Sequence, residues 1–208
     1  MKNFYTFFLI TFFGCQVFGF SQQLTPFPKN PPATTQMTYL ELPDIVLGSA
    51  SAPVTLVEYS SLDCVHCAHF HHDVLPKIKE QFVDKGLVKI VYRHFPLDGT
   101  AVRAMAIISK LPQDKWYDGV SKALANQALW VQDVTKLGQI CGIDEATCQA
   151  AIKDPKLLNL VVAKRYNTEK RLNIEVTPSF EILSAKGNEA ILTGIKPEEL
   201  MKKITSKI

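Results

Sequence analysis

Two cysteines stand three positions apart in residues 61–75, SLDCVHCAHFHHDVL, with four histidines close to them. Cys64 and Cys67 have the Cys-X-X-Cys spacing of a redox-active pair. Two neighbouring thiols can also bind a metal ion or form an inert structural disulfide. The residue types therefore permit three kinds of chemistry, and the place of the pair in the fold must decide between them.

The redox interpretation is favoured because a predicted strand, residues 54–59, ends just before the pair and a predicted helix, residues 64–85, begins at it. The unpaired N–H groups of a first helical turn favour a thiolate and lower the pKa of Cys64. Cys67, one turn further on, is less exposed and can attack a mixed disulfide to release the product. His66 can give the Cys64 thiolate a positive or hydrogen-bonding neighbour. An inert disulfide is the alternative.

A zinc site is less favoured. Structural zinc takes four ligands, usually from two cysteine pairs or from one pair and two spaced histidines. The three later histidines point in different directions around a helix, and we expect them to face solvent opposite the apolar stripe; they are His69, His71 and His72. A mixed site of Cys64, Cys67 and one histidine is left open. We expect no metal, and no cofactor other than the disulfide of the pair.

The composition excludes some classes of function. The chain has 208 residues, 47% of them hydrophobic and 21% charged, which is typical of a globular protein with a real core. Its formal net charge of +3 is too small and too scattered to indicate nucleic-acid binding. No Gly-rich phosphate loop occurs.

The first 21 residues have the pattern of a secretory signal peptide. Lys2 precedes an apolar run of about eleven residues, and the small residues Gly19 and Ser21 follow. A bilayer span needs about 20 residues, so a retained anchor is the less favoured alternative, and a lipid on Cys15 is another. Cleavage would leave four cysteines, an even number that suggests disulfides in an exported chain.

The remaining chain divides into four segments. Residues 22–43 are polar and proline-rich and predict an extended tether. Residues 44–98 predict strand, helix and strand, a βαβ unit with parallel strands, and Pro76 predicts a kink in its helix. Residues 99–172 show only helical patterns. Residues 173–208 predict a ββα unit in which a short Gly-containing turn joins the strands.

These features resemble the DsbA family of thiol–disulfide oxidoreductases. The resembling segments are APVTLVEYSSLDCVHC, VYRHFP and VTPSF, and the likeness extends from about Gly48 to the C-terminus. It implies an α/β protein with a thioredoxin fold (βαβ…ββα) and an inserted all-helical domain. It also implies that the Thr177–Pro178 bond is cis and faces the cysteine pair. The backbone of Thr177, with Pro178 and Val65, would bind the substrate chain.

The resemblance also assigns Glu58 and a second cysteine pair. Glu58 falls where the family carries a buried acid, and it would accept the proton of the resolving thiol; a solvent-facing strand residue is the alternative. Cys141 and Cys148 resemble a second, structural disulfide in the helical domain of some members, particularly an alphaproteobacterial group. The turn between them, with Gly142 ending one helix and Asp144 capping the next, supports this pairing. Two buried free cysteines are the alternative.

The expected function is that of an exported, monomeric enzyme in the periplasm that introduces disulfides into reduced or unfolded exported proteins. The family implies Cys64 as nucleophile, Cys67 as resolving thiol, and reoxidation by a DsbB-like quinone-linked membrane protein. Two departures leave the oxidising strength open: Val65 stands where strongly oxidising members carry proline, and the charge of Asp63 opposes a neighbouring thiolate. A disulfide isomerase or reductase is the first alternative. A periplasmic metal-binding module that is not an enzyme is the second.

Overall fold

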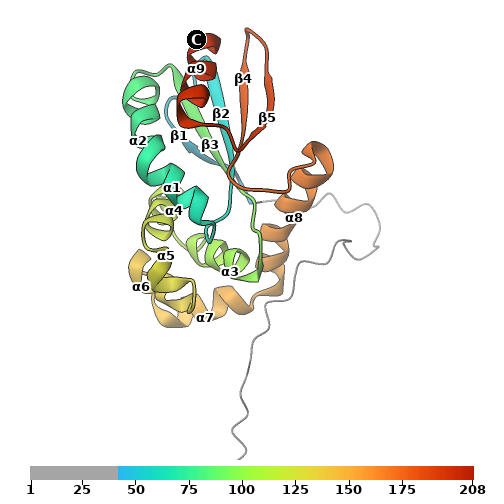
Figure 1. The fold of residues 1–208 in the computed structure, drawn as a ribbon. Coiled ribbons are helices and arrows are strands. Elements are labelled where there is room, and N and C mark those ends of the chain that lie inside the picture. Colours follow the sequence, from blue (N-terminus) through green and yellow to red (C-terminus); the bar gives the residue numbers. More distant parts are fainter. Residues whose placement is uncertain (1–41) are drawn as a thin grey trace, which may run out of the picture.

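The computed structural model describes residues 42–208. The expected signal peptide, Cys15 and all but the last two residues of the expected tether lie outside the described residues. Figure 1 shows one sheet, with most of the helices between β3 and β4 gathered beyond one of its ends. The predicted α/β architecture, in which a helical insertion separates a βαβ unit from a ββα unit, is confirmed.

Five strands form the sheet in the order β1-β3-β2-β4-β5. β2 and β3 are parallel, whereas the other neighbouring strands are antiparallel. The parallel pair follows from the crossover helix between these strands. The strands are β1 (Ile45–Leu47), β2 (Val54–Ser60), β3 (Val88–His94), β4 (Ser179–Ser184) and β5 (Glu189–Thr193).

The crossover helix differs from the single kinked helix expected over residues 64–85. Two π-helical turns, Phe70–Val74 and Lys79–Val83, alternate with α1 (Val65–His69) and α2 (Leu75–Ile78). In the first π turn the Leu75 N–H bonds to Phe70 O, five residues back. This wider turn ends directly before Pro76, whose ring would clash with the carbonyl four residues back in a regular α-helix.

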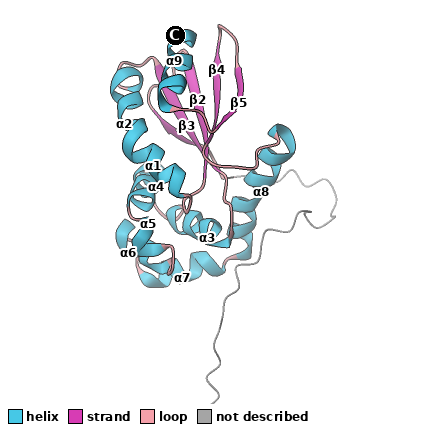
Figure 2. Cartoon of the chain, in the orientation of Figure 1, coloured by secondary structure: helices cyan, strands magenta, loops and turns pink. Residues whose placement is uncertain are grey.

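All elements between β3 and β4 are helical (Figure 2). Asp98 caps the first of them by accepting hydrogen bonds from two backbone N–H groups, and Asp154 caps the longest in the same way. The elements are α3 (Gly99–Ile108), a 3-10 turn (Gln113–Lys115), α4 (Trp116–Ala125), α5 (Gln127–Trp130), α6 (Thr135–Cys141), α7 (Glu145–Lys153) and α8 (Pro155–Leu172). The chain ends with α9 (Pro197–Lys207).

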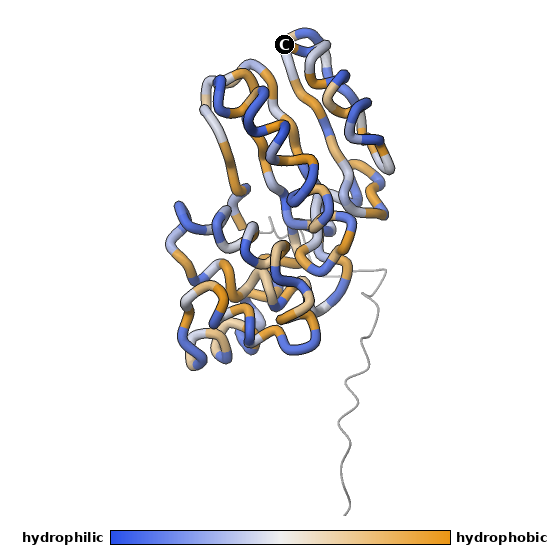
Figure 3. The backbone as a smooth tube through the Cα atoms, turned by 60° about the vertical axis from the view of Figure 1, so that its left-hand side comes forward, coloured by the Kyte–Doolittle hydropathy of each residue, from blue (hydrophilic) through white to orange (hydrophobic). Residues whose placement is uncertain are grey.

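Two hydrophobic clusters hold these parts together. One packs α2, the second π turn and α9 against the same face of the sheet, and includes Leu56, Ile78 and Ile204. The other joins the helical insertion to β1, β3 and α1 and to the loop after β2, and includes Leu62, Cys67 and Trp130. Figure 3 shows the hydrophobic segments along the strands and at intervals along the helices. The cysteine pair therefore lies at the junction of the sheet and the helical insertion.

Candidate active site

Cys64 stands at the point where β2 ends and the crossover helix begins. Its backbone is extended, with φ of −77° and ψ of 118°, and it occupies the N-cap position of α1. Its carbonyl oxygen accepts hydrogen bonds from the N–H groups of Cys67 and Ala68, both at 3.1 Å. The sulfur therefore lies beside the first helical turn, whose N–H groups have no partner within the helix.

Several hydrogen bonds lower the pKa of Cys64 to about 5. The largest contribution is a hydrogen bond from the Cys67 thiol, and the hydroxyl of Thr177 and the backbone N–H groups of Cys67 and His66 add to it, against the opposing effect of burial. As a thiol, Cys64 donates to the Thr177 carbonyl oxygen at 3.3 Å, and within the described residues the Thr177 hydroxyl then has no partner. That hydroxyl is free to donate to the thiolate. Cys64 is thus built to be ionised at neutral pH.

Cys67 has the opposite environment. Its side chain is fully buried, and burial, the hydrogen bond that it donates to Cys64 and the charges of Cys64 and Glu58 all raise the pKa of its thiol. Two thiols one helical turn apart therefore differ strongly in acidity. The partly exposed, acidic thiol can serve as a nucleophile and leaving group, and the buried thiol remains protonated until a proton acceptor removes its proton.

Glu58 is completely buried on β2, and it points to the face of the sheet that the crossover helix covers. Both of its carboxylate oxygens lie 3.0 Å from Nε2 of His71. The expectation that His71 faces solvent was wrong, because only 7% of its side chain is exposed. His69 and His72 do face solvent, with side chains 80% and 83% exposed.

The burial of His71 has a simple geometric reason. It follows the buried Cys67 by four residues and precedes the buried Leu75 by four, so it lies on the face of the helix that is turned toward the sheet. Periodicity could therefore have identified it. Its partner could not be identified in this way, because Glu58 belongs to a strand.

The predicted substrate-binding residues lie around Cys64. The Thr177–Pro178 peptide bond is cis, and the contact of Thr177 with Cys64 brings this bond to the cysteine pair. Val65, the first residue of α1, is exposed, as is Val176 next to Thr177. Among the described residues, the contribution of His66 to Cys64 comes from its backbone N–H rather than its ring.

Asp63 and Gln127 add contacts that the sequence did not predict. Asp63 accepts a hydrogen bond from the Ser61 hydroxyl at 2.5 Å, and burial and the neighbouring Asp98 raise the pKa of its carboxyl to about 6. The side-chain amide of Gln127, on α5, donates to Leu62 O at 2.7 Å and to Cys64 O at 3.0 Å. Gln127 thus connects the helical insertion to the backbone of Cys64. A single glutamine in a helical segment gives no sequence signal for such a contact.

The second cysteine pair lies on α6 and α7. Cys141 and Cys148 are free thiols in this structure, as are Cys64 and Cys67, so the expected bridge is not formed here and stays a prediction for the oxidised protein. Gly142 ends α6 with φ of 74°, and Asp144 caps α7. The Cys148 sulfur packs so closely on Gly138, one turn before Cys141, that a Cβ there would lie 2.0 Å from it.

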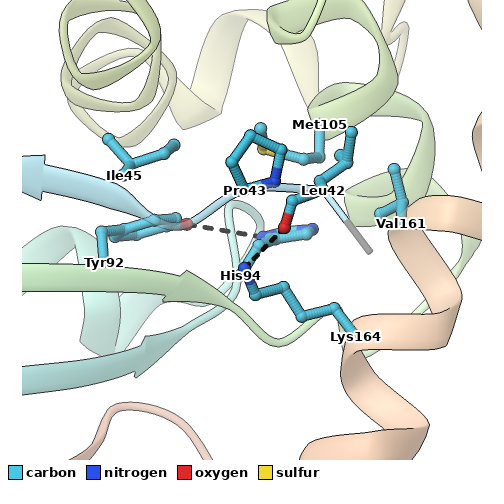
Figure 4. A pocket seen from close by; sticks show the side chains of 8 residues that line it. All are labelled: Leu42, Pro43, Ile45, Tyr92, His94, Met105, Val161 and Lys164. Atoms are coloured by element: carbon cyan, nitrogen blue, oxygen red, sulfur yellow. Dashed lines mark hydrogen bonds between the residues drawn. The ribbon is translucent and has the colours of Figure 1, made fainter. Parts of the chain in front are cut away.

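A small cavity lies where residues 42–45 meet β3, α3 and α8 (Figure 4). The Tyr92 hydroxyl lies 3.5 Å from Nδ1 of His94, and Lys164 donates to Leu42 O at 2.7 Å. Burial lowers the pKa of His94 to about 3, so its ring is neutral. Asp44 holds residues 42–45 in place through ion pairs with Arg93 and Lys164.

Among residues 42–208, no group of three His, Cys, Asp or Glu side chains is placed to hold a metal ion. No helix of these residues has the length and apolar character to cross a bilayer.

The amino-acid sequence is similar to those of known proteins. A family model described as thioredoxin matches residues 41–204. A putative protein-disulfide oxidoreductase of Rickettsia conorii is 26% identical over 166 residues, which cover 72% of this chain and 57% of the relative. Disulfide bond formation protein D of Bacillus subtilis is 28% identical over 147 residues, which cover 66% of each chain. The chain thus spans less than two thirds of the length of each of these relatives.

Solved structures give the same result for the fold. The crystal structure of Wolbachia pipientis alpha-DsbA1 superposes with a TM-score of 0.68 at 25% identity, over 81% of this chain and 92% of that one. Oxidised BdbD from Bacillus subtilis superposes with a TM-score of 0.66 at 24% identity, over 79% and 92% of the two chains. The fold with its helical insertion is therefore shared with these proteins.

Proposed function

The chain belongs to the thioredoxin family and, within it, to the DsbA-like proteins, and from this premise we propose that it is a thiol–disulfide oxidoreductase that introduces disulfide bonds into other proteins. The observation that carries the proposal is the difference in acidity between Cys64 and Cys67. An inert structural disulfide needs no such difference. A redox pair does, because its two sulfurs act in different steps.

In the proposed reaction a substrate thiolate attacks the Cys64 sulfur of the Cys64–Cys67 disulfide. A mixed disulfide forms, and Cys67 departs and takes up a proton. A second substrate thiolate then attacks the substrate sulfur of the mixed disulfide, which forms the substrate disulfide and releases the Cys64 thiolate. Two electrons pass from the substrate to the cysteine pair. The acidity of Cys64 makes it a good leaving group in the last step.

The same acidity supports oxidation over reduction as the direction of the reaction. A thiolate stabilised in the reduced enzyme makes the disulfide a stronger oxidant. With a pKa of about 5 for Cys64, the stabilisation at pH 7 is roughly 2 kcal/mol after allowance for solvent screening. This corresponds to about 40 mV for a two-electron couple. At pH 7 a carboxyl with a pKa of about 6 is largely ionised, so the charge of Asp63 opposes the Cys64 thiolate and reduces this effect.

The surface around Cys64 supports a polypeptide as substrate. Two of the large apolar side chains that the described residues expose are next to this site in the chain: Val65 follows Cys64, and Val176 precedes Thr177. Such a surface suits the apolar side chains of an unfolded chain. We propose reduced or unfolded exported proteins as substrates, with a monomer acting in the periplasm after signal-peptide cleavage. A DsbB-like quinone-linked membrane protein would reoxidise it.

The proposed function is tested with a reduced, unfolded test protein that regains activity only after its disulfides form. The parent protein is expected to oxidise it, and Cys64→Ser is expected to be inactive. The reduction potential of the pair, measured against a glutathione buffer in a Cys141→Ser/Cys148→Ser background, should lie above that of glutathione. A potential well below it would make the protein a reductase and contradict the proposal.

A further inference from the structure

The buried pair of Glu58 and His71 is not among the main groups that set the pKa of Cys64, yet it lies beside the resolving thiol. Cys67 and His71 are four residues apart and therefore neighbours on one helix face, and the charge of Glu58 contributes to the raised pKa of the Cys67 thiol. Nε2 of His71 lies 3.0 Å from both oxygens of the Glu58 carboxylate. The single N–H of Nε2 is therefore shared between both oxygens, and the remaining lone pairs of the carboxylate stay open to a further donor.

The other titratable groups around this pair do not change their protonation state near neutral pH. Burial raises the pKa values of Tyr92 and of Tyr117, the latter to about 12, and lowers the pKa of His94 so that its ring is neutral. The ring of Tyr92 also packs edge-on against that of His71, with centroids 6.0 Å apart. The titratable groups that interact with Glu58 are Cys67 on α1, Tyr92 on β3 and Tyr117 on α4, and His94 lies behind Tyr92.

We propose that His71 is a positioning residue of the redox site, which orients Glu58 beside Cys67 and carries the proton of Cys67 between Glu58 and solvent. Glu58 has no exposed surface of its own, so a proton on it needs a route to water. The 7% of the His71 side chain that is exposed provides the end of that route. This proposal rests on the proposed function and extends it to a residue on the helix.

The proton balance differs between the two half-reactions. When a substrate thiolate opens the Cys64–Cys67 disulfide, Cys67 leaves and takes a proton that His71 and Glu58 supply. During reoxidation the Cys64 thiolate attacks an oxidant disulfide, which breaks the oxidant S–S bond, forms a mixed disulfide and releases the oxidant's first sulfur as a thiolate. Cys67 then gives its proton to Glu58 and attacks the Cys64 sulfur, which forms the Cys64–Cys67 bond and releases the oxidant's second sulfur as a thiolate. The role of His71 is therefore confined to steps that involve Cys67.

The test uses Ellman's reagent, an aromatic disulfide, with the reduced protein in a background that lacks the other cysteines: Cys15→Ser/Cys141→Ser/Cys148→Ser. Attack by Cys64 releases one coloured thiolate, and attack by Cys67 on the mixed disulfide releases a second. In His71→Gln we expect the first phase to be unchanged and the second to be roughly tenfold slower. The second phase should also accelerate with pH further into the alkaline range than in the parent, because Cys67 must then ionise unaided.

His72→Gln is the matched control, since that side chain is exposed on the same helix turn; both of its phases should equal those of the parent. His71→Gln leaves the Glu58 carboxylate buried without its partner, which destabilises the fold. The double variant Glu58→Gln/His71→Gln avoids this, because two amides can hydrogen-bond without a buried charge. Since His71 is proposed to act through Glu58, the second phase of the double variant should be as slow as that of Glu58→Gln alone, and no slower.

Three results would overturn the role of His71: a second phase at the parent rate in His71→Gln, equal slowing of both phases in that variant, or a second phase in the double variant that is slower than in Glu58→Gln alone. Because Ellman's reagent is not a protein, these results do not depend on the polypeptide substrate. A parent that shows both phases but fails to oxidise the reduced test protein would contradict the proposed function and leave the role of His71 intact.

Discussion

The Cys64 sulfur lies 3.3 Å from the Thr177 carbonyl oxygen, although 113 residues separate the two in the sequence. The contact joins the βαβ unit to the ββα unit across the long helical insertion. It brings together the nucleophile and the backbone proposed to bind the substrate. The acidity of Cys64 is therefore expected to respond to changes at Thr177.

Replacement of Thr177 by valine tests this relationship. Thr177→Val keeps the shape of the side chain but removes the hydroxyl that can donate to the Cys64 thiolate. A hydrogen bond to a charged group contributes about 1.5 kcal/mol or more, so the pKa of Cys64 should rise by roughly one unit. The pH dependence of alkylation by iodoacetamide measures it. Thr193→Val, at an exposed position of β5, is the control and should not move the midpoint.

The reduced protein should gain stability over the oxidised protein as the pH rises from about 5. Because the pKa of Cys64 falls from 9.0 to about 5 on folding, its contribution to stability is fully present above pH 9.0 and is lost as the pH falls to about 5. Urea unfolding of both forms at several pH values in this range measures the difference. Reduced Cys64→Ser should lack this increase, and an equal increase in that variant would refute the assignment to Cys64.

Asp63→Asn should stabilise the protein at neutral pH and not in acid. The pKa of the Asp63 carboxyl is raised from 3.8 to about 6. The stability linked to this group is therefore present below pH 3.8 and is lost as the pH rises through about 6. We expect Asp63→Asn to gain about 1–2 kcal/mol over the parent at pH 7 and little at pH 4. Thermal unfolding at both pH values measures this, with the exposed Asp114→Asn as the control.

Gln127→Ala should loosen the backbone around the nucleophile. The change removes two hydrogen bonds, to Leu62 O and Cys64 O, and the loss of stability should be about 1–3 kcal/mol. Amide hydrogen exchange of residues 62–68 should become faster than in Gln139→Ala, which alters an exposed glutamine of α6. Unchanged exchange in residues 62–68 would show that Gln127 does not hold this backbone.

The second cysteine pair is expected to form a bridge under oxidising conditions. The Cys141–Cys148 bond would close a short loop and stabilise the protein by about 2–3 kcal/mol. Thiol counting in a Cys64→Ser/Cys67→Ser background, before and after reduction, tests the bond, and thermal unfolding of the two forms measures its effect. If both thiols titrate without reduction, the bridge is absent and the pair consists of free cysteines, as in this structure.

The sequence by itself determined the elements and the position of the redox pair. Alternation in β3 and the apolar spacing of the crossover helix report which residues are buried, because burial follows the local geometry of a strand or a helix. In β2 almost every residue is buried, because the strand lies in the middle of the sheet with both faces covered. The place of Cys64 between β2 and α1 follows from the same local patterns. Even the inward position of His71 was present in its spacing from Cys67, although the cluster of histidines suggested a polar face.

Only the tertiary structure decided which groups meet. The partner of His71 is Glu58 on β2, and the amide that donates to Cys64 O belongs to Gln127 on α5. The carboxyl beside Asp63 is that of Asp98, which caps α3. Periodicity reports the face on which a residue lies, but not which distant element docks against that face. The pKa values of the site depend on those contacts and on burial. The acidity of Cys64 could therefore be anticipated in direction and in the contribution of the first-turn N–H groups, while the contributions of the Cys67 thiol and the Thr177 hydroxyl became visible only in the folded chain.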